Sequence, residues 1–124
     1  MAPPRMMRAL LPVSEFELQD EGDGRFVLTG EMSFRTAEEI LRASEGLFDK
    51  HTRIEVDLSR VEKADSAGLA LLLEWITWAN HTVREIRYAS MPERVLAIAK
   101  TTEVDHLLDR GERWAGFIES PDTV

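Results

Sequence analysis

The sequence predicts an α/β domain in which helices pack against a small mixed β-sheet, in the order β-β-α-β-α-β-α. Short β-rich or alternating runs are separated by segments whose hydrophobic residues recur at helical spacing. A helical segment also separates the second strand from the third, which is the signature of a right-handed crossover between parallel strands. At 124 residues the chain is long enough to bury a hydrophobic core as one domain.

The first two strands are expected to form a hairpin. Phe16 and Leu18 alternate with charged and polar neighbours, as in a half-buried strand. Gly-Asp-Gly at 22–24 is a strong turn signal, and Phe-Val-Leu-Thr at 26–29 provides the returning strand.

A helix is expected next, ending near Lys50. Thr36 and Glu39 have the spacing of a capping box at its start. Hydrophobic and small residues then recur along one face: Ala37, Ile40, Leu41, Ser44, Leu47 and Phe48. The β-rich run at 54–58 follows as a central strand.

The second half of the domain repeats this alternation. A helix is expected from Ser66 to Asn80, and Ile-Arg-Tyr-Ala at 86–89 predicts a further strand. Ser90 and Glu93 repeat the capping-box spacing before a third helix, whose hydrophobic residues are Val95, Leu96, Ile98 and Ala99.

The predicted domain spans residues 14–110, and Val104, Leu107 and Leu108 suggest one more helical turn within it. Residues 1–13 are expected to form a flexible arm, or alternatively a short segment that lies on a partner or membrane surface. Residues 111–124 form a tail, in which Trp114, Phe117 and Ile118 form a last strand or simply pack against the domain.

Composition excludes several function classes. The net charge of −8 argues against nucleic-acid binding and against electrostatic adhesion to anionic lipid. The absence of cysteine excludes disulfides, thiolate zinc sites and thiol nucleophiles. No stretch approaches the roughly 18 apolar residues that a membrane span requires, and the N-terminus does not have the pattern of a signal peptide.

The motifs of common enzyme classes are also missing. The three histidines are scattered without metal-ligand spacing, so no metal site is expected. Glycine-rich phosphate loops and the Gly-x-Ser-x-Gly elbow are absent, and no spacing singles out a pair of carboxylates. We therefore expect a protein that is not an enzyme and that uses no cofactor.

The helix at 66–80 has two hydrophobic stripes. Leu69, Leu72, Leu73 and Ile76 form the stripe expected to face the core, and Ala67, Leu71, Trp75 and Trp78 lie on the opposite side. An exposed patch containing two tryptophans would mark a protein interface. The hypothesis predicts that glutamate at both tryptophans abolishes partner binding while the monomer stays folded. The alternatives are that the arm or tail covers this stripe, or that the chain forms a homodimer there.

Ser66 lies where the loop becomes a helix. Either Asp65 or Ser66 could cap the first turn, and a phosphate on Ser66 would be held by the same backbone N–H groups. Gly68 permits close approach of a partner. The predicted partner-binding residues are therefore Asp65, Ser66, Ala67, Gly68, Leu71, Trp75 and Trp78, with Ser66 also a phospho-acceptor candidate.

These residues resemble the signature of STAS domains, which occur in anti-sigma factor antagonists and sulfate transporters. The resemblance is carried by Val-Asp-Leu-Ser at 56–59, a short linker at 60–64 and Asp-Ser-Ala-Gly-Leu at 65–69. Gly-Glu-Met-Ser-x-x-Thr-Ala at 30–37 is similar to the family's stretch between second strand and first helix. The resemblance covers about 14–110 and implies the STAS fold.

Within the family, Ser-Arg-Val at 59–61 and Leu-Ala-Leu-Leu-Leu at 69–73 look most like the small STAS subunit of the Mla phospholipid transporter. This ABC system maintains outer-membrane lipid asymmetry. The resemblance implies a non-catalytic cytoplasmic subunit that binds and supports the ATPase subunit, peripheral to the inner membrane through a complex with a permease. Ser66 then matches the family's functional hydroxyl at the ATPase contact.

The alternative is an anti-sigma factor antagonist, in which a partner anti-sigma factor kinase phosphorylates Ser66. Antagonists usually carry Asp where this chain has Ser33, and often a second hydroxyl where it has Ala67. Both departures count against regulation by a kinase. An enzyme fragment or small-molecule sensor is a third interpretation, with no motif in its favour.

Overall fold

The computed structural model describes residues 15–108. The elements are β1 (Phe16–Gly22), β2 (Arg25–Met32), α2 (Ala37–Glu45), the 3-10 helix η1 (Phe48–Lys50), β3 (Arg53–Ala64), α3 (Ser66–His81), β4 (Glu85–Ala89) and α4 (Glu93–Thr101). The strands form one four-stranded sheet in the order β1-β2-β3-β4. β1 is antiparallel to β2, whereas the β2–β3 and β3–β4 pairs are parallel. The predicted α/β class, mixed sheet and element order are confirmed. The predicted arm and tail lie outside the described residues.

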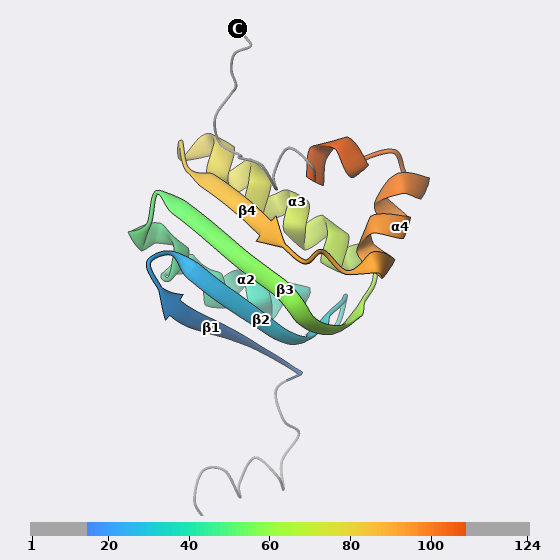
Figure 1. Ribbon diagram of the computed structural model, residues 1–124, viewed down its shortest axis with the longest axis horizontal. Coiled ribbons are helices and arrows are strands. Elements are labelled where there is room, and N and C mark those ends of the chain that lie inside the picture. Colours follow the sequence, from blue (N-terminus) through green and yellow to red (C-terminus); the bar gives the residue numbers. More distant parts are fainter. Residues whose placement is uncertain (1–14, 109–124) are drawn as a thin grey trace, which may run out of the picture.

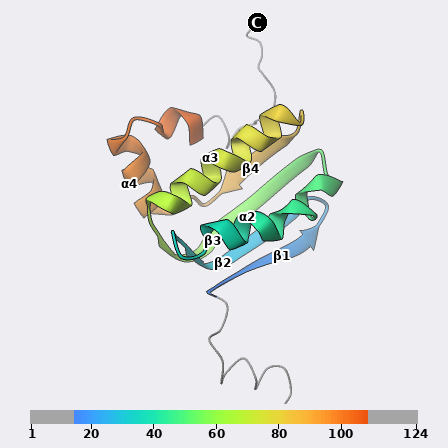
Figure 2. The same ribbon diagram turned by 180° about the vertical axis from the view of Figure 1, so that it is seen from behind.

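The helices α2 and α3 cover one face of the sheet. The sheet lies in front of them in Figure 1, and the view from behind shows both helices crossing it, with α3 between α2 and α4 (Figure 2). Burial alternates accordingly along the strands, so that Phe26 and Leu28 are buried while Arg25 is exposed. The core therefore lies between the sheet and the helices.

The other face of the sheet is polar. Cross-strand register places Glu55 between Arg25 on β2 and Arg87 on β4. Arg53 Nε lies 3.1 Å from Glu85 Oε1. These residues line a hollow of about 380 Å³ in which arginines and carboxylates alternate. Such an alternation of charges suits a solvated sheet face rather than a site selective for one charge.

The strand β3 is longer than expected. The segment at 60–64, predicted as a linker, continues the strand to Ala64. Its polar residues have no hydrophobic alternation, but the backbone pairs with β2 as far as Met32↔Ala64, past two register shifts. Pairing with a neighbouring strand, rather than local sequence, therefore extends β3.

The helix starts also differ from the capping-box predictions. Thr36 makes no side-chain cap to α2; its Oγ1 instead donates to the Glu31 carbonyl at 2.8 Å and accepts from the Ser33 N–H at 3.0 Å. The residue before α4 is Pro92, not Ser90, and it provides no side-chain cap. The first predicted helix also ends early, at Glu45, and η1 follows as a separate turn.

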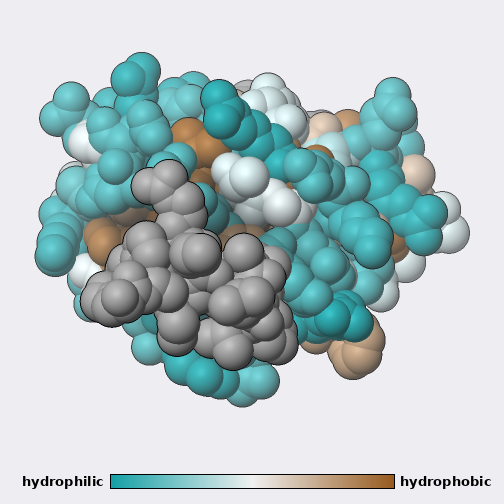
Figure 3. Space-filling view, turned by 90° about the horizontal axis from the view of Figure 1, so that it is seen from below, coloured by the Kyte–Doolittle hydropathy of each residue, from teal (hydrophilic) through white to brown (hydrophobic). Residues whose placement is uncertain are grey.

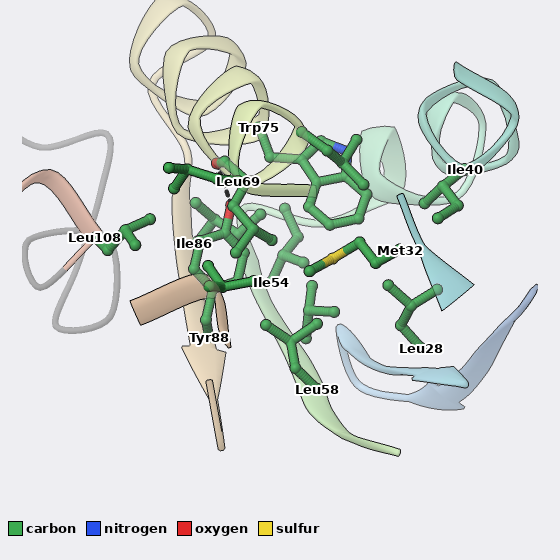
Figure 4. Packing of buried hydrophobic residues seen from close by; sticks show 14 of the residues in the cluster. Leu28, Met32, Ile40, Ile54, Leu58, Leu69, Trp75, Ile86, Tyr88 and Leu108 are labelled. Carbon is green, nitrogen blue, oxygen red and sulfur yellow. Dashed lines mark hydrogen bonds between the residues drawn. The ribbon is translucent and has the colours of Figure 1, made fainter. Parts of the chain in front are cut away.

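Trp75 belongs to the core, so the prediction of an exposed tryptophan stripe is wrong for it. Its side chain is 1% exposed, and Leu71 is 4% exposed. Figure 4 shows Trp75 directed from α3 toward Met32 and Ile40. The indole Nε1 donates to Ser44 Oγ at 3.0 Å. The physical reason is that α3 is flanked by α2 and α4 as well as by the sheet, so both of its hydrophobic stripes are covered.

Trp78 is half-buried rather than free for a partner. The Arg84 guanidinium lies 5.0 Å from the centroid of its ring, and the Phe48 ring lies 6.0 Å away. Arg84 is held there by hydrogen bonds to the carbonyls of His51 and Asp49, at 2.8 and 2.9 Å. The chain's own loops therefore cover much of the stripe that was expected to need a second protein.

Candidate functional site

The carboxyl ends of the three parallel strands meet at one edge of the sheet. β2 ends at Met32, β3 at Ala64 and β4 at Ala89, and the loops that follow lead into the three helices. This edge is at the lower right in Figure 1, where α3 and α4 begin. In open sheets with parallel strands, binding residues gather at this edge.

Asp65 organises the edge. Its Oδ1 accepts hydrogen bonds from the backbone N–H groups of Ala67 at 2.8 Å and Gly68 at 3.3 Å, which caps α3. Its Oδ2 accepts from the N–H of Phe34 at 3.2 Å, in the loop between β2 and α2. One carboxylate thus fixes the start of the helix relative to the neighbouring loop.

Ser66 is left outside this capping arrangement. The sequence left open whether Asp65 or Ser66 caps α3, and the structure assigns the cap to Asp65. Ser66 is exposed at the first helical position, where the N-terminal N–H groups carry partial positive charge. The hydroxyl is therefore presented to solvent at the edge.

Gly68 is required by the packing of α3 against β2. A Cβ atom at this position would collide with the carbonyl oxygen of Met32. The glycine therefore serves a close approach within the domain, rather than the close approach of a partner that the sequence suggested.

The loop between β2 and α2 is held by hydrogen bonds. Ser33, which is 6% exposed, donates from Oγ to Glu31 Oε2 at 2.5 Å and accepts from the Arg35 N–H at 3.1 Å. The Arg35 guanidinium contacts Glu15 through Nε at 3.2 Å and Nη2 at 2.5 Å. The hydrogen bond from Arg35 keeps the pKa of Glu15 below its usual value. The loop therefore has a defined conformation.

Phe34 stands out in this loop, although no pattern in the sequence points to it. Its side chain is 79% exposed, and among the described residues the other large hydrophobic side chain that is exposed is Val83, at 77%. Figure 3, viewed from the side of β1, shows a mostly hydrophilic surface with scattered hydrophobic atoms outside the grey region. Phe34 becomes a candidate site residue because its loop lies close to Asp65, a proximity that the fold creates and the sequence does not reveal.

The predicted site residues thus fall into two groups. Asp65, Ser66, Ala67 and Gly68 lie together at the edge, with Ala67 half-buried and Gly68 buried. Leu71 and Trp75 belong to the core, and Trp78 is partly covered by Arg84.

Neither a cluster of metal ligands nor a membrane-spanning helix occurs among the described residues. Within 15–108, His, Asp and Glu side chains form no group of three that could hold a metal ion. None of the helices in that range is long and apolar enough to cross a membrane. The edge presents the exposed hydroxyl-bearing residue Ser66 and the exposed aromatic residue Phe34, which suits contact with another macromolecule.

Comparisons with solved structures support the same fold. The unphosphorylated anti-sigma factor antagonist SpoIIAA is 19% identical, with a TM-score of 0.57, and the match covers 73% of this chain and 83% of that one. A crystal structure of TM1081 from Thermotoga maritima, an anti-sigma factor antagonist candidate, is 20% identical, with a TM-score of 0.60 and coverage of 75% and 82%. An NMR structure of TM1081 gives 18% identity, a TM-score of 0.59 and coverage of 77% and 78%.

At these identities the solved structures bear on the fold alone. A search of the curated proteins found no match to the chain. A family model described as "Mlab, STAS domain" matches residues 16–109, which is most of the chain. The α/β sheet, the Asp-Ser-Ala-Gly turn at its edge and this match lead to one conclusion: the chain belongs to the STAS domain family.

Proposed function

We propose that this chain is a non-catalytic STAS subunit of a phospholipid-transport ABC system, which binds and supports the ATPase subunit. The ATPase docks on the edge formed by the loops after β2, β3 and β4, around Ser66. The complex includes a membrane permease, so the chain sits at the cytoplasmic side of the inner membrane, and the system maintains outer-membrane lipid asymmetry.

The observation that carries the proposal is the exposed hydroxyl of Ser66. Because Asp65 caps α3, Ser66 is not needed for the helix start and is available for an intermolecular contact. The description of the matching family model, "Mlab, STAS domain", supports a transporter partner. So does the resemblance of the segments at 59–61 and 69–73 to the transporter subunit.

A second candidate is an anti-sigma factor antagonist that a kinase inactivates by phosphorylating Ser66. One of the solved structures that share the fold, SpoIIAA, is described as an anti-sigma factor antagonist in its unphosphorylated form, and it motivates this candidate. A phosphate would add a charge of about −2 next to Asp65 and would disfavour docking. Against it, the position where antagonists usually have Asp is the nearly buried Ser33, whose hydroxyl is bonded within its own loop.

Affinity capture from the native cells in mild detergent, followed by mass spectrometry, separates the two candidates. The proposal expects an ABC ATPase together with its membrane permease, in stoichiometric amounts. A soluble anti-sigma factor kinase, together with phosphate on Ser66, would establish the second candidate instead. A strain lacking the tag on this chain controls for adventitious capture.

Substitution of Ser66 provides an independent criterion. A docking hydroxyl tolerates Ser66→Ala in part, whereas Ser66→Asp weakens ATPase binding more because an unpaired charge must be desolvated. A phosphorylation switch predicts opposite behaviour, with one variant inactive and the other permanently active. Titration of each purified variant against the ATPase measures which pattern holds.

A further inference from the structure

We infer that Phe34 is the hydrophobic anchor of the docking edge, inserting into an apolar pocket of the ATPase subunit, and that Asp65 positions it. This inference deepens the proposed function and rests on it. It assigns the main contact to a side chain that the sequence signature of the family does not include.

Phe34 has the features of an anchor. Its ring is 79% exposed, although an exposed aromatic ring gains nothing for folding. Aromatic side chains at the centre of interfaces contribute much of the binding energy. The ring lies at the same edge as Ser66, because the Asp65 carboxylate binds the Phe34 N–H at 3.2 Å and the N–H groups of Ala67 and Gly68.

The loop that carries Phe34 is preorganised. Its neighbours Ser33 and Thr36 are buried, at 6% and 2% exposure, and the Ser33 N–H donates to Thr36 Oγ1 at 3.0 Å. A loop that is already ordered loses little backbone conformational entropy on binding, which favours affinity. The flanking residues therefore fix the backbone that presents the exposed ring.

The charges around Phe34 favour a protein pocket over a lipid surface. Arg35 follows Phe34 in the sequence, and its guanidinium is hydrogen-bonded to Glu15 and lies 3.8 Å from Glu31. A lipid phosphate would have to compete with these two carboxylates for it. The net charge of −8 also opposes approach to an anionic bilayer. An apolar pocket in the ATPase buries the ring without leaving an unpaired charge.

The test is the affinity of purified chains for the purified ATPase subunit, with Val83→Ala as the matched control. Val83 is 77% exposed, like Phe34, but lies between α3 and β4, away from the edge. Phe34→Ala is expected to weaken binding by about 30-fold or more, and Val83→Ala by less than about 3-fold. Thermal unfolding should be unchanged in Phe34→Ala, because an exposed side chain contributes little to stability.

A double-mutant cycle tests the positioning role of Asp65. Asparagine also caps helices, but its single oxygen cannot accept at both positions that the carboxylate oxygens occupy. Asp65→Asn should therefore weaken binding several-fold in the wild-type background and have little further effect when Phe34 is already alanine. Additive losses would show that Asp65 acts independently of Phe34.

The outcomes separate the inference from the function. If the wild-type chain binds the ATPase and Phe34→Ala binds within about 3-fold of it, Phe34 is not the anchor although the proposed function stands. If the wild-type chain does not bind the ATPase at micromolar concentration, the proposed function itself is wrong. Sedimentation with phosphatidylglycerol vesicles that depends on Phe34 would assign the ring to a membrane and overturn the inference.

Discussion

Replacing Trp75 by alanine is expected to remove a large part of the stability of this domain. The indole is 1% exposed and packs against Phe48, with ring centroids 5.1 Å apart, and against Tyr88, at 6.4 Å. It also donates to Ser44 Oγ, a hydroxyl that is itself buried. The substitution therefore removes the side chain that joins α3, η1 and β4.

The magnitude follows from the contacts that are lost. Truncation of a buried Trp costs about 3–5 kcal/mol in transfer and cavity energy. Loss of the hydrogen bond to Ser44 adds about 1 kcal/mol. Small domains have about 5–15 kcal/mol in total, so Trp75→Ala should remove about a quarter or more of the free energy of unfolding. Trp75→Phe keeps an aromatic ring and should cost about 1.5–3 kcal/mol.

Urea denaturation followed by far-ultraviolet circular dichroism measures these changes without depending on tryptophan fluorescence. Trp78→Ala is the matched control. Its side chain is half-buried under Arg84, so we expect a smaller loss of about 1–2 kcal/mol. An unfolding free energy for Trp75→Ala within 1 kcal/mol of the wild type would refute the assignment of Trp75 to the core.

Two further predictions concern the packing of α3 and β4. Gly68→Ala should destabilise the fold by about 1–3 kcal/mol, because the new Cβ meets the Met32 carbonyl oxygen. The control Gly46→Ala, which has no atom near the new Cβ, should be neutral or stabilising by up to about 1 kcal/mol. Equal changes in the free energy of unfolding, measured by urea denaturation, would argue against the close approach of α3 to β2. Burial raises the pKa of the Tyr88 hydroxyl well above its ordinary value of 10.0. As pH rises, the Tyr88 hydroxyl therefore loses its proton in the unfolded chain before it does so in the folded one. The contribution of this hydroxyl to the free energy of unfolding is fully present below pH 10, and it is lost as pH rises from there toward the raised pKa of the folded state. Unfolding free energies measured between pH 8 and about pH 11 should fall more steeply for the wild type than for Tyr88→Phe, and parallel curves would contradict this assignment.

The periodic patterns in the sequence were enough to predict the class, the element order and the start of α3. Strand alternation at Phe16 and Leu18, and the helical spacing after Thr36, correspond to β1 and α2. These patterns record which side of an element is hydrophobic, and that information is local.

What the sequence could not predict depends on neighbouring elements. Both hydrophobic stripes of α3 are buried because α2 and α4 flank it, so Trp75 is core rather than surface. The segment 60–64 is strand because β2 pairs with it, although its polar residues suggested a linker. Thr36 bonds to Glu31 instead of capping its helix, a choice made by the packing of the β2–α2 loop.

The sequence pointed to the turn at Asp65 and Ser66 but not to Phe34, because only the turn is a local pattern. The turn at Asp65 and Ser66 is a contiguous signature and could be found by eye. Phe34 is 31 positions away from Asp65 in the sequence, and it takes the parallel pairing of β2 with β3 and the hydrogen bond between the two residues to show that they share an edge. A single exposed aromatic residue in a loop has no pattern that distinguishes it from a buried one.

Amide hydrogen exchange of the chain alone and in complex with the purified ATPase tests whether the ATPase docks on the edge around Ser66, as we propose. Protection should increase at 33–35, at 65–70 and at 90–91, in the loops that follow the three parallel strands and at the start of α3. Amides at 82–84 and 22–24, at the opposite end of the sheet, should exchange at unchanged rates. Protection confined to that opposite end, with Ser66 and its neighbours unaffected, would show that the ATPase does not dock on the edge around Ser66.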